Sequence, residues 1–200
     1  MTTSVDELTE PASTGGRSGG RLAPFIALGI AVALIGLVVL FIGADPDAPA
    51  PQGASPLLGK PAPEAVGELD DGTPFDLSRR KGSWVVLNFF QSSCIPCIAE
   101  HPELVEFVDQ QAGLGAQGAE FYSVVTGDTR ANVEAFFERE GGDWPAIYSD
   151  GDQITVAFGV AQVPETWIID PRGVVQARFQ GEVTAEVLSV TIQQIREGIR

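Results

Sequence analysis

The apolar and polar positions of this 200-residue chain divide it into a long apolar run near the N-terminus and a remainder of mixed character. Residues 22–44 hold no charged side chain over 23 positions. As an α-helix this run would extend about 35 Å, whereas the hydrocarbon core of a bilayer is about 30 Å thick. Arg17 and Arg21 lie just before the run, and Asp45 and Asp47 lie just after it. The pattern therefore predicts a membrane-spanning helix, and the positive-inside rule places its N-terminal end in the cytoplasm.

A cleaved signal peptide and a buried helix of a soluble core are the alternatives for this run. The apolar region of a signal peptide usually has only about 7 to 15 residues, which favours an uncleaved anchor. The next residues are rich in Pro, Ala and polar side chains, as is typical of an extended tether. We therefore expect a disordered cytoplasmic tail (1–21), a transmembrane anchor (22–44), a Pro/Ala-rich linker (45–56) and an extracytoplasmic domain (57–200). This organisation is that of a single-pass protein of the cell membrane.

Within residues 57–200 the pattern alternates between strand-like and helix-like segments. Two short segments flank the turn dipeptide Asp71-Gly72 and predict a hairpin over 66–77. A near-continuous apolar run at 84–90 predicts a central strand that is buried on both faces. The other expected strands are 121–125, 144–148, 166–169 and 174–179, and the expected helices are 97–111, 131–140, 153–160 and 184–199. Because strands alternate with helices and a turn at 170–173 joins two strands, we expect an α/β domain with a central mixed sheet flanked by helices.

The composition is that of a globular chain with an acidic surface. Hydrophobic residues make up 44% and charged residues 20% of the chain, and the formal net charge is −15. Residues 45–200 hold 24 of the 27 acidic and 10 of the 12 basic residues, a net charge of −14. A field of this sign repels phosphate backbones, so nucleic acid is excluded as a partner. The acidity fits either a solvated surface or attraction of a basic protein client.

Cys94 and Cys97 are the only cysteines and lie where the apolar strand passes into the next helix. A structural disulfide is one alternative, but closing a loop of about four residues contributes only about 2 kcal/mol, against about 4.7 kcal/mol for about a hundred residues. A zinc site is another, but it needs two further ligands and the only histidine is His101. The spacing therefore favours a redox-active disulfide that requires no metal and no organic cofactor.

The positions of the two cysteines also predict separate roles. Cys94 would lie at the start of the helix, where unpaired N–H groups and the positive end of the helix dipole favour a thiolate. We therefore expect Cys94 to attack a client disulfide and Cys97, one turn further, to resolve the mixed disulfide. Pro96 limits the conformations of the loop between them, which keeps the sulfurs within bonding distance.

Three motifs of the domain match a known pattern. They are NFFQSSCIPC from Asn88 to Cys97, a C-x-x-E-x-P continuation with Glu100 and Pro102, and GVAQVPETWIID from Gly159 to Asp170. With these motifs the chain resembles the thioredoxin-like superfamily, and within it the membrane-anchored TlpA, ResA and CcmG group of thiol-disulfide oxidoreductases. The resemblance covers about residues 57–200 and implies a thioredoxin-like fold. It also implies a cis peptide bond between Val163 and Pro164 that faces the disulfide, where the backbone can bind an extended client.

The resemblance further singles out Glu100. Thioredoxins proper have a buried aspartate six residues before the first cysteine, where this chain has Asn88, an amide that cannot accept a proton. The resembled group has a glutamate three residues after the second cysteine, and Glu100 stands there, at i, i+3 from Cys97 on the expected helix. We predict that Glu100 handles a proton near Cys97 or recognises the client; the alternative is a surface carboxylate of little structural importance. Ser93 replaces the family's usual tryptophan, and His101 is expected to face solvent.

The leading functional prediction is an enzyme that reduces disulfides in exported proteins, and the resemblance implies apocytochrome c as one such client. Cytosolic thioredoxin could not recharge it across a membrane, so a membrane thiol electron donor is the implied partner. The reverse activity, thiol oxidation for protein folding, stays open because of Ser93. A copper-binding chaperone that uses Cys94, Cys97 and His101 is a third alternative. A peroxidase is disfavoured, because Gln91 stands where peroxiredoxins have Thr or Ser.

Overall fold

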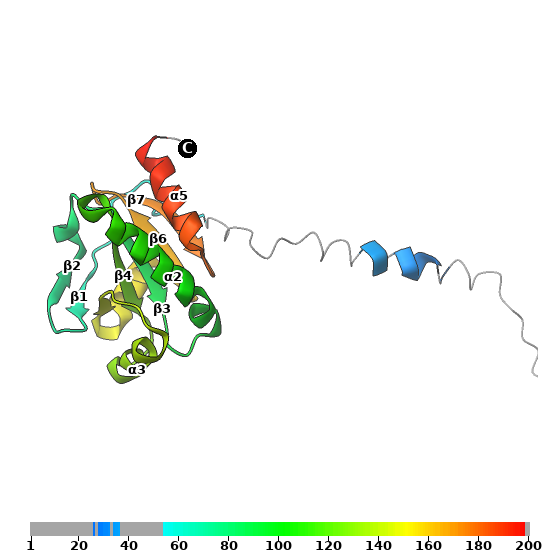
Figure 1. The fold of residues 1–200 in the computed structure, drawn as a ribbon, viewed down its shortest axis with the longest axis horizontal. Coiled ribbons are helices and arrows are strands. Elements are labelled where there is room, and N and C mark those ends of the chain that lie inside the picture. Colours follow the sequence, from blue (N-terminus) through cyan, green and yellow to red (C-terminus); the bar gives the residue numbers. More distant parts are fainter. Residues whose placement is uncertain (1–25, 27, 33, 37–53, 199–200) are drawn as a thin grey trace, which may run out of the picture. The chain divides into compact units, whose positions relative to one another are not determined.

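A computed structural model describes residues 26, 28–32, 34–36 and 54–198 (Figure 1). The three short stretches before residue 54 are helical and exposed. Among all of these described residues, no helix is both long enough and apolar enough to cross a membrane. The expected tail lies wholly outside the described residues, as do much of the expected anchor and most of the linker. These three segments therefore stay predictions.

A seven-stranded mixed sheet forms the centre of the domain. Across the sheet the strands follow the order β2-β1-β5-β4-β3-β6-β7. The strands are β1 (Val66–Leu69), β2 (Pro74–Asp76), β3 (Val85–Phe90), β4 (Glu120–Val125), β5 (Ala146–Tyr148), β6 (Glu165–Ile169) and β7 (Val175–Gln180). β4 pairs in parallel with both β3 and β5, whereas the other neighbouring strands are antiparallel. The expected mixed sheet is confirmed.

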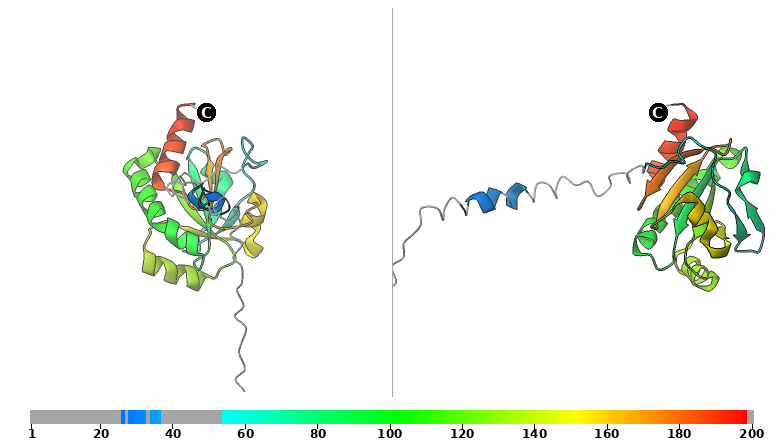
Figure 2. Two further views of the ribbon diagram at one scale, coloured as in Figure 1. Left: turned by 90° about the vertical axis from the view of Figure 1, so that its right-hand side faces the viewer. Right: turned by 180° about the vertical axis from the view of Figure 1, so that it is seen from behind.

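Helices cover both faces of this sheet. One face carries α2 (Ile95–Gly113), α3 (Arg130–Glu140) and α5 (Ala185–Arg196), and the other carries α4 (Gln153–Phe158), as Figure 2 shows. α2 and α5 lie side by side. The 3₁₀ helices η1 (Leu77–Arg80), η2 (Gly115–Gln117) and η3 (Asp150–Asp152) form short connections. The α/β class and the flanking helices are therefore as expected from the sequence.

β3 shows why an uninterrupted apolar run forms the centre of the sheet. Leu87 and Phe89 point to one face and pack in a cluster with Phe158 of α4. Val86 points to the other face and packs in a second cluster with Leu104 of α2. Because both sides of the strand are covered, it needs no polar face, and all of its six residues are buried.

The two edges of the sheet are both shielded. One edge is β2, which has three residues and begins with Pro74. At the other edge, the segment before the hairpin runs along the start of β7: the Gly59 N–H donates to the Val175 carbonyl and the Ala62 N–H to the Gly173 carbonyl, each at 2.8 Å. These hydrogen bonds join the beginning of the domain to its last strand.

The segment with the two cysteines lies between β3 and α2. β3 ends at Phe90 and the parallel strand β4 ends at its register partner Val125. α2 begins at Ile95, two residues before the expected start at Cys97, because Cys94 caps the helix. The cysteines therefore lie beyond the carboxyl ends of parallel strands, where open α/β sheets usually place their binding sites.

Candidate active site

Cys94 and Cys97 form a disulfide at the N-terminus of α2. The Cys94 Sγ accepts a hydrogen bond from the Cys97 backbone N–H at 3.2 Å. In the reduced protein this N–H and the helix dipole would both stabilise a thiolate at Cys94. Cys94 is half-buried, whereas Cys97 is only 3% exposed. The geometry thus leaves Cys94 the more accessible of the two cysteines and covers Cys97.

Val163 and Pro164 lie opposite the disulfide. The peptide bond between them is cis, as expected, and the Val163 carbonyl oxygen lies 3.6 Å from the Cys94 Sγ. Both cysteines belong to an apolar group that we call the Cys97 cluster. It consists of Phe90, Cys97, Val125, Val133, Phe136 and Ala146, with Cys94, Ile98, Phe137, Tyr148 and Val163 packed against it. The fold thus brings together site residues that lie 69 positions apart in the chain.

Glu100 is buried, and the alternative of a surface carboxylate is wrong. The residue is only 2% exposed. The Val183 N–H donates to Oε1 at 3.0 Å, and the Asn88 side-chain amide donates to Oε2 at 3.2 Å. The same Asn88 nitrogen also donates to Thr166 Oγ1 at 3.0 Å. One residue from each of the three sequence motifs, Asn88, Glu100 and Thr166, therefore takes part in one buried hydrogen-bond network. Through Val183 this network also joins α2 to the loop before α5.

Burial is the dominant influence on the Glu100 carboxyl. Loss of solvent raises the pKa of Glu100 to about 8, although the hydrogen bonds from Val183 and Asn88 favour the charged form and act against this rise. The charge of nearby Glu182 adds to the rise. A thiol has an ordinary pKa of about 8.5, so a carboxyl with this pKa could exchange a proton with a cysteine at little cost. In the disulfide form, within residues 54–198, its hydrogen bonds go to Val183 and Asn88 and none goes to Cys97.

His101 is also buried, at 4% exposure, and the expectation that it faces solvent is wrong. Its Nε2 lies 2.9 Å from the Gly141 carbonyl oxygen, and its ring packs against Phe136, Phe137 and Trp144. Burial lowers the pKa of His101, which favours the neutral imidazole donating to Gly141. A copper site would have to use Nδ1 or break this hydrogen bond. These partners come from α3 and from the segment that follows it, which helical spacing on α2 cannot reveal.

Asp128 is a site residue that sequence reasoning missed. Its Oδ2 accepts a hydrogen bond at 2.7 Å from the N–H of Ser92, two residues before Cys94. Partial burial raises the pKa of Asp128, but hydrogen bonds from Ser92, Asn132 and the Thr129 N–H outweigh it and hold this pKa below its usual range. An aspartate directly before the helix cap Thr129 could have indicated a turn. Its contact with the cysteine loop, 36 positions earlier, could not be read from spacing.

The fold and the disulfide define a thiol-disulfide oxidoreductase of thioredoxin-like architecture, and comparisons with known proteins agree. The AhpC/TSA family model matches residues 58–178. The thiol-disulfide oxidoreductase ResA of Geobacillus thermodenitrificans is 32% identical over 139 residues, which is 70% of this chain and 78% of that protein. The thiol:disulfide interchange protein HelX of Rhodobacter capsulatus is 33% identical over 145 residues, with 71% and 78% covered. The chain therefore belongs to the AhpC/TSA family and is an enzyme of thiol-disulfide exchange.

A solved structure supports the same fold. The thiol:disulfide interchange protein of the thioredoxin family from Chlorobium tepidum TLS superposes with a TM-score of 0.60. The match covers 71% of this chain and 98% of that chain at 23% identity, so it bears on the fold alone. The thioredoxin-like fold that the motifs implied is confirmed.

Proposed function

We propose that this enzyme reduces disulfides of exported proteins, with Cys94 as the attacking thiolate and Cys97 as the resolving thiol. The observation that carries the proposal is the asymmetry of the pair. Cys94 is accessible and its Sγ accepts the Cys97 N–H, whereas Cys97 is buried beneath it. The accessible sulfur is therefore also the one whose negative charge is stabilised.

The reaction consists of two exchanges. The Cys94 thiolate attacks one sulfur of a client disulfide, forms a mixed disulfide and releases the other client sulfur as a thiolate. Cys97 then loses its proton and attacks the Cys94 sulfur, which forms the internal disulfide and releases the second client thiolate. Two electrons pass from the enzyme to the client, and each released thiolate takes up a proton. A membrane thiol electron donor would return the enzyme to the dithiol form.

Glu100 is the group that we assign to the proton of Cys97. The two residues lie one turn apart on α2 and are both buried. With its pKa raised to about 8, Glu100 can accept a proton from a thiol and give it to a leaving thiolate. Asn88 and Val183 hold the carboxyl in place by the hydrogen bonds described above.

Val163 and Pro164 form the surface on which we place the client backbone. The Val163 carbonyl faces the sulfur that attacks, so an extended client segment paired there would bring its disulfide to Cys94. The apolar run at 22–44 and its flanking charges support a membrane anchor with the domain outside the cytoplasm. The acidic domain suits a basic client, and apocytochrome c is the client that the family resemblance suggests. Labelling of reduced Cys94 in whole cells with a membrane-impermeant maleimide tests the location.

Cysteine variants test the assignment of roles. Cys97→Ser should accumulate mixed disulfides with client proteins, because Cys94 can still attack but nothing resolves the product. Cys94→Ser should neither trap clients nor turn over disulfides. The measurement is non-reducing electrophoresis after reaction with a disulfide-containing protein, with the double serine variant as the control. Trapping by the Cys94 variant and not by the Cys97 variant would reverse the roles.

The reduction potential decides the direction. Thioredoxin-type reductants lie near about −270 mV, whereas strong oxidants of folding proteins lie near about −120 mV. We expect a value close to the reductants, measured by equilibration with glutathione or dithiothreitol buffers. A value near the oxidants would support the alternative function of a thiol oxidase.

A further inference from the structure

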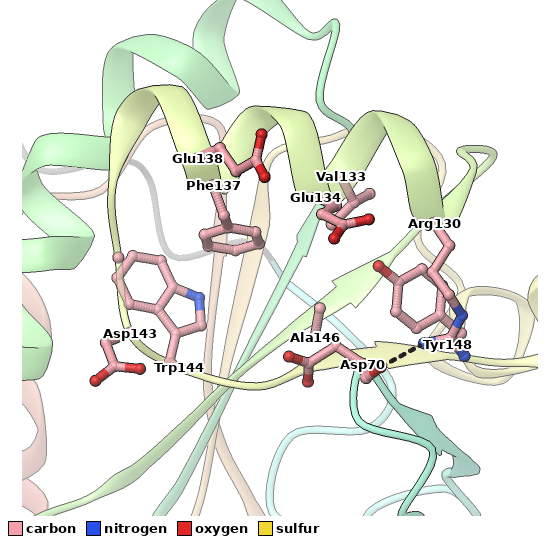
Figure 3. A pocket seen from close by; sticks show the side chains of 11 residues that line it. Asp70, Arg130, Val133, Glu134, Phe137, Glu138, Asp143, Trp144, Ala146 and Tyr148 are labelled. Atoms are coloured by element: carbon pink, nitrogen blue, oxygen red, sulfur yellow. Dashed lines mark hydrogen bonds between the residues drawn. The ribbon is translucent and has the colours of Figure 1, made fainter.

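A groove between α3 and β5 lies apart from the residues to which the mechanism assigns roles. It has a volume of about 360 Å³. Figure 3 shows side chains from α3 facing those of β5 and of the loop before it. The apolar floor of this α3–β5 groove is formed by Val133, Phe137, Trp144, Ala146 and Tyr148, and its acidic rim by Asp70, Glu134, Glu138 and Asp143.

The acidic rim has unbalanced charge. Arg130, the one basic residue that lines the groove, donates to Glu68 Oε1 at 2.8 Å and to the Asp70 carbonyl at 3.1 Å. Its guanidinium also lies 4.0 Å from the ring centroid of Tyr148. The guanidinium of Arg130 is therefore already engaged by contacts with Glu68, Asp70 and Tyr148. Within residues 54–198, none of the four rim carboxylates forms an ion pair. A cation in the groove would meet carboxylates that have no competing partner there.

The floor of the groove is held in shape before any ligand binds. The Trp144 indole N–H donates to Ser123 Oγ at 2.8 Å, and the ring meets Phe137 edge to face, with 5.5 Å between ring centroids. Gly142 has a φ of +101°, and a Cβ atom there would lie 2.8 Å from the Trp144 ring. A side chain at this position would displace the indole. The groove thus has a fixed aromatic wall, which lowers the entropic cost of binding.

The floor adjoins the redox centre. Val133 and Ala146 are members of the Cys97 cluster, and Phe137 and Tyr148 pack against it. These floor residues and the two cysteines therefore belong to one continuous apolar cluster. A polypeptide that presents a disulfide to Cys94 could place a nearby residue in the groove.

We propose that the α3–β5 groove binds a lysine or arginine side chain of the client polypeptide. The aliphatic stem of such a side chain would cover Phe137 and Trp144, and its charged end would lie among the rim carboxylates. A cation close to these rings also gains from their π-electrons. The proposal rests on the proposed function in that the occupant is a client, and it adds a second contact point beside the Val163-Pro164 backbone.

The test compares two triple variants of the full chain that each remove three exposed carboxylates. The groove variant is Glu134→Gln, Glu138→Gln and Asp143→Asn; the control variant is Glu106→Gln, Asp109→Asn and Glu186→Gln, on α2 and α5. Both change the net charge equally, so only the location of the charges differs. The probes are short cysteine-free peptides that are identical except for Lys, Gln or Glu at two central positions, and the dissociation constant is measured by fluorescence anisotropy.

The Lys peptide should bind the parent chain more tightly than the Gln peptide, and the Glu peptide should bind least. In the groove variant the dissociation constant for the Lys peptide should rise about tenfold, as expected for the loss of several exposed charge contacts, and in the control variant it should change less than about twofold. Equal weakening in both variants would overturn the proposal, since general acidity would then suffice. Equal binding of the Lys and Gln peptides to the parent chain would also overturn it.

Kinetics separate this proposal from the proposed function. With a disulfide peptide that carries Lys, the groove variant should show a higher KM at unchanged kcat, and turnover of a small neutral disulfide should stay the same. If no disulfide substrate reacts with the parent chain, the proposed function fails, but the binding contrast with cysteine-free peptides still decides the groove.

Discussion

Asp128 and Glu100 support the segments on either side of the disulfide, and the two carboxylates differ in how far they are removed from water. Asp128 holds the loop before Cys94 from a half-buried position and accepts several N–H groups. Glu100 lies in the turn after Cys97 and is almost wholly removed from water. The hydrogen bonds keep the pKa of Asp128 low, whereas burial outweighs two hydrogen bonds at Glu100 and raises its pKa.

The comparison shows that hydrogen bonds alone do not decide the charge of a carboxyl group. Asp128 stays ionised at neutral pH, so its charge can serve to fix a loop. Glu100 is mainly protonated at neutral pH and lies close to equal populations near pH 8, which suits proton exchange with a thiol. In the proposed mechanism Asp128 positions the loop before Cys94 and Glu100 transfers a proton.

Replacing Glu100 by alanine should have the largest effect. Glu100→Ala leaves the Val183 N–H and the Asn88 amide buried without this acceptor, which should lower the free energy of unfolding by about 2 to 4 kcal/mol. The matched control is Glu106→Ala, an exposed carboxylate on the same helix, for which we expect less than about 0.5 kcal/mol. Urea unfolding measures both. Equal unfolding midpoints for the two variants would mean that the buried hydrogen bonds of Glu100 contribute nothing to stability.

Glu100→Gln sharpens the comparison through pH. Because the folded pKa of about 8 lies above the ordinary value of 4.5, the unfolded chain releases this proton first, and the parent protein loses stability as pH rises between these values. Glutamine does not titrate, so the stability of the variant relative to the parent should increase across the same window. Below it, both side chains are neutral and of similar shape, and the difference should be small. A difference that is constant with pH would contradict the raised pKa.

The same variant bears on the reaction. Resolution of the mixed disulfide should slow, and its pH profile should change between about pH 5 and 9, because Gln cannot accept a proton. Superimposable profiles for the two proteins would remove Glu100 from the mechanism.

Asp128→Ala should have the smallest effect of the three changes. Loss of the bond to the Ser92 N–H should cost about 1 kcal/mol and slow the attack of Cys94 a few-fold, because the loop becomes less well positioned. The contribution of Asp128 to stability is present above its unfolded pKa of about 3.9 and disappears as pH falls through the lower folded value. Asp128→Asn, which keeps an acceptor oxygen, is the control. If Cys94 of the alanine variant attacks a disulfide as fast as Cys94 of the parent, the loop between β3 and α2 needs no support from Asp128.

Most of the fold could be predicted because its signals are local. The strand at 84–90 has an apolar run that only a doubly covered strand requires, and the helix at 184–199 was expected to begin at Thr184, which is indeed the cap of α5. The end of that expected helix, however, is Arg196. Boundaries depend on the last hydrogen bonds of an element, which composition describes poorly.

The surroundings of the site could not be predicted to the same extent. The two cysteines and the cis bond at Val163-Pro164 followed from motifs, but the burial of Glu100 depends on the backbone of Val183, 83 residues further on. His101 is covered by rings that α3 and the next loop supply. Helical spacing shows which residues share a side of α2, and it says nothing of what that side meets.

The shielded edges of the sheet bear on whether copies of the protein can pair with one another through their strands. An open strand offers unpaired N–H and carbonyl groups to a neighbour and invites edge-to-edge aggregation. Here Pro74 removes a donor from the short strand β2, and the Gly59 and Ala62 N–H groups occupy carbonyls at the start of β7. If extended client segments bind beside Val163 as proposed, that pairing would not extend to the sheet edges, which offer another copy little opportunity to bind.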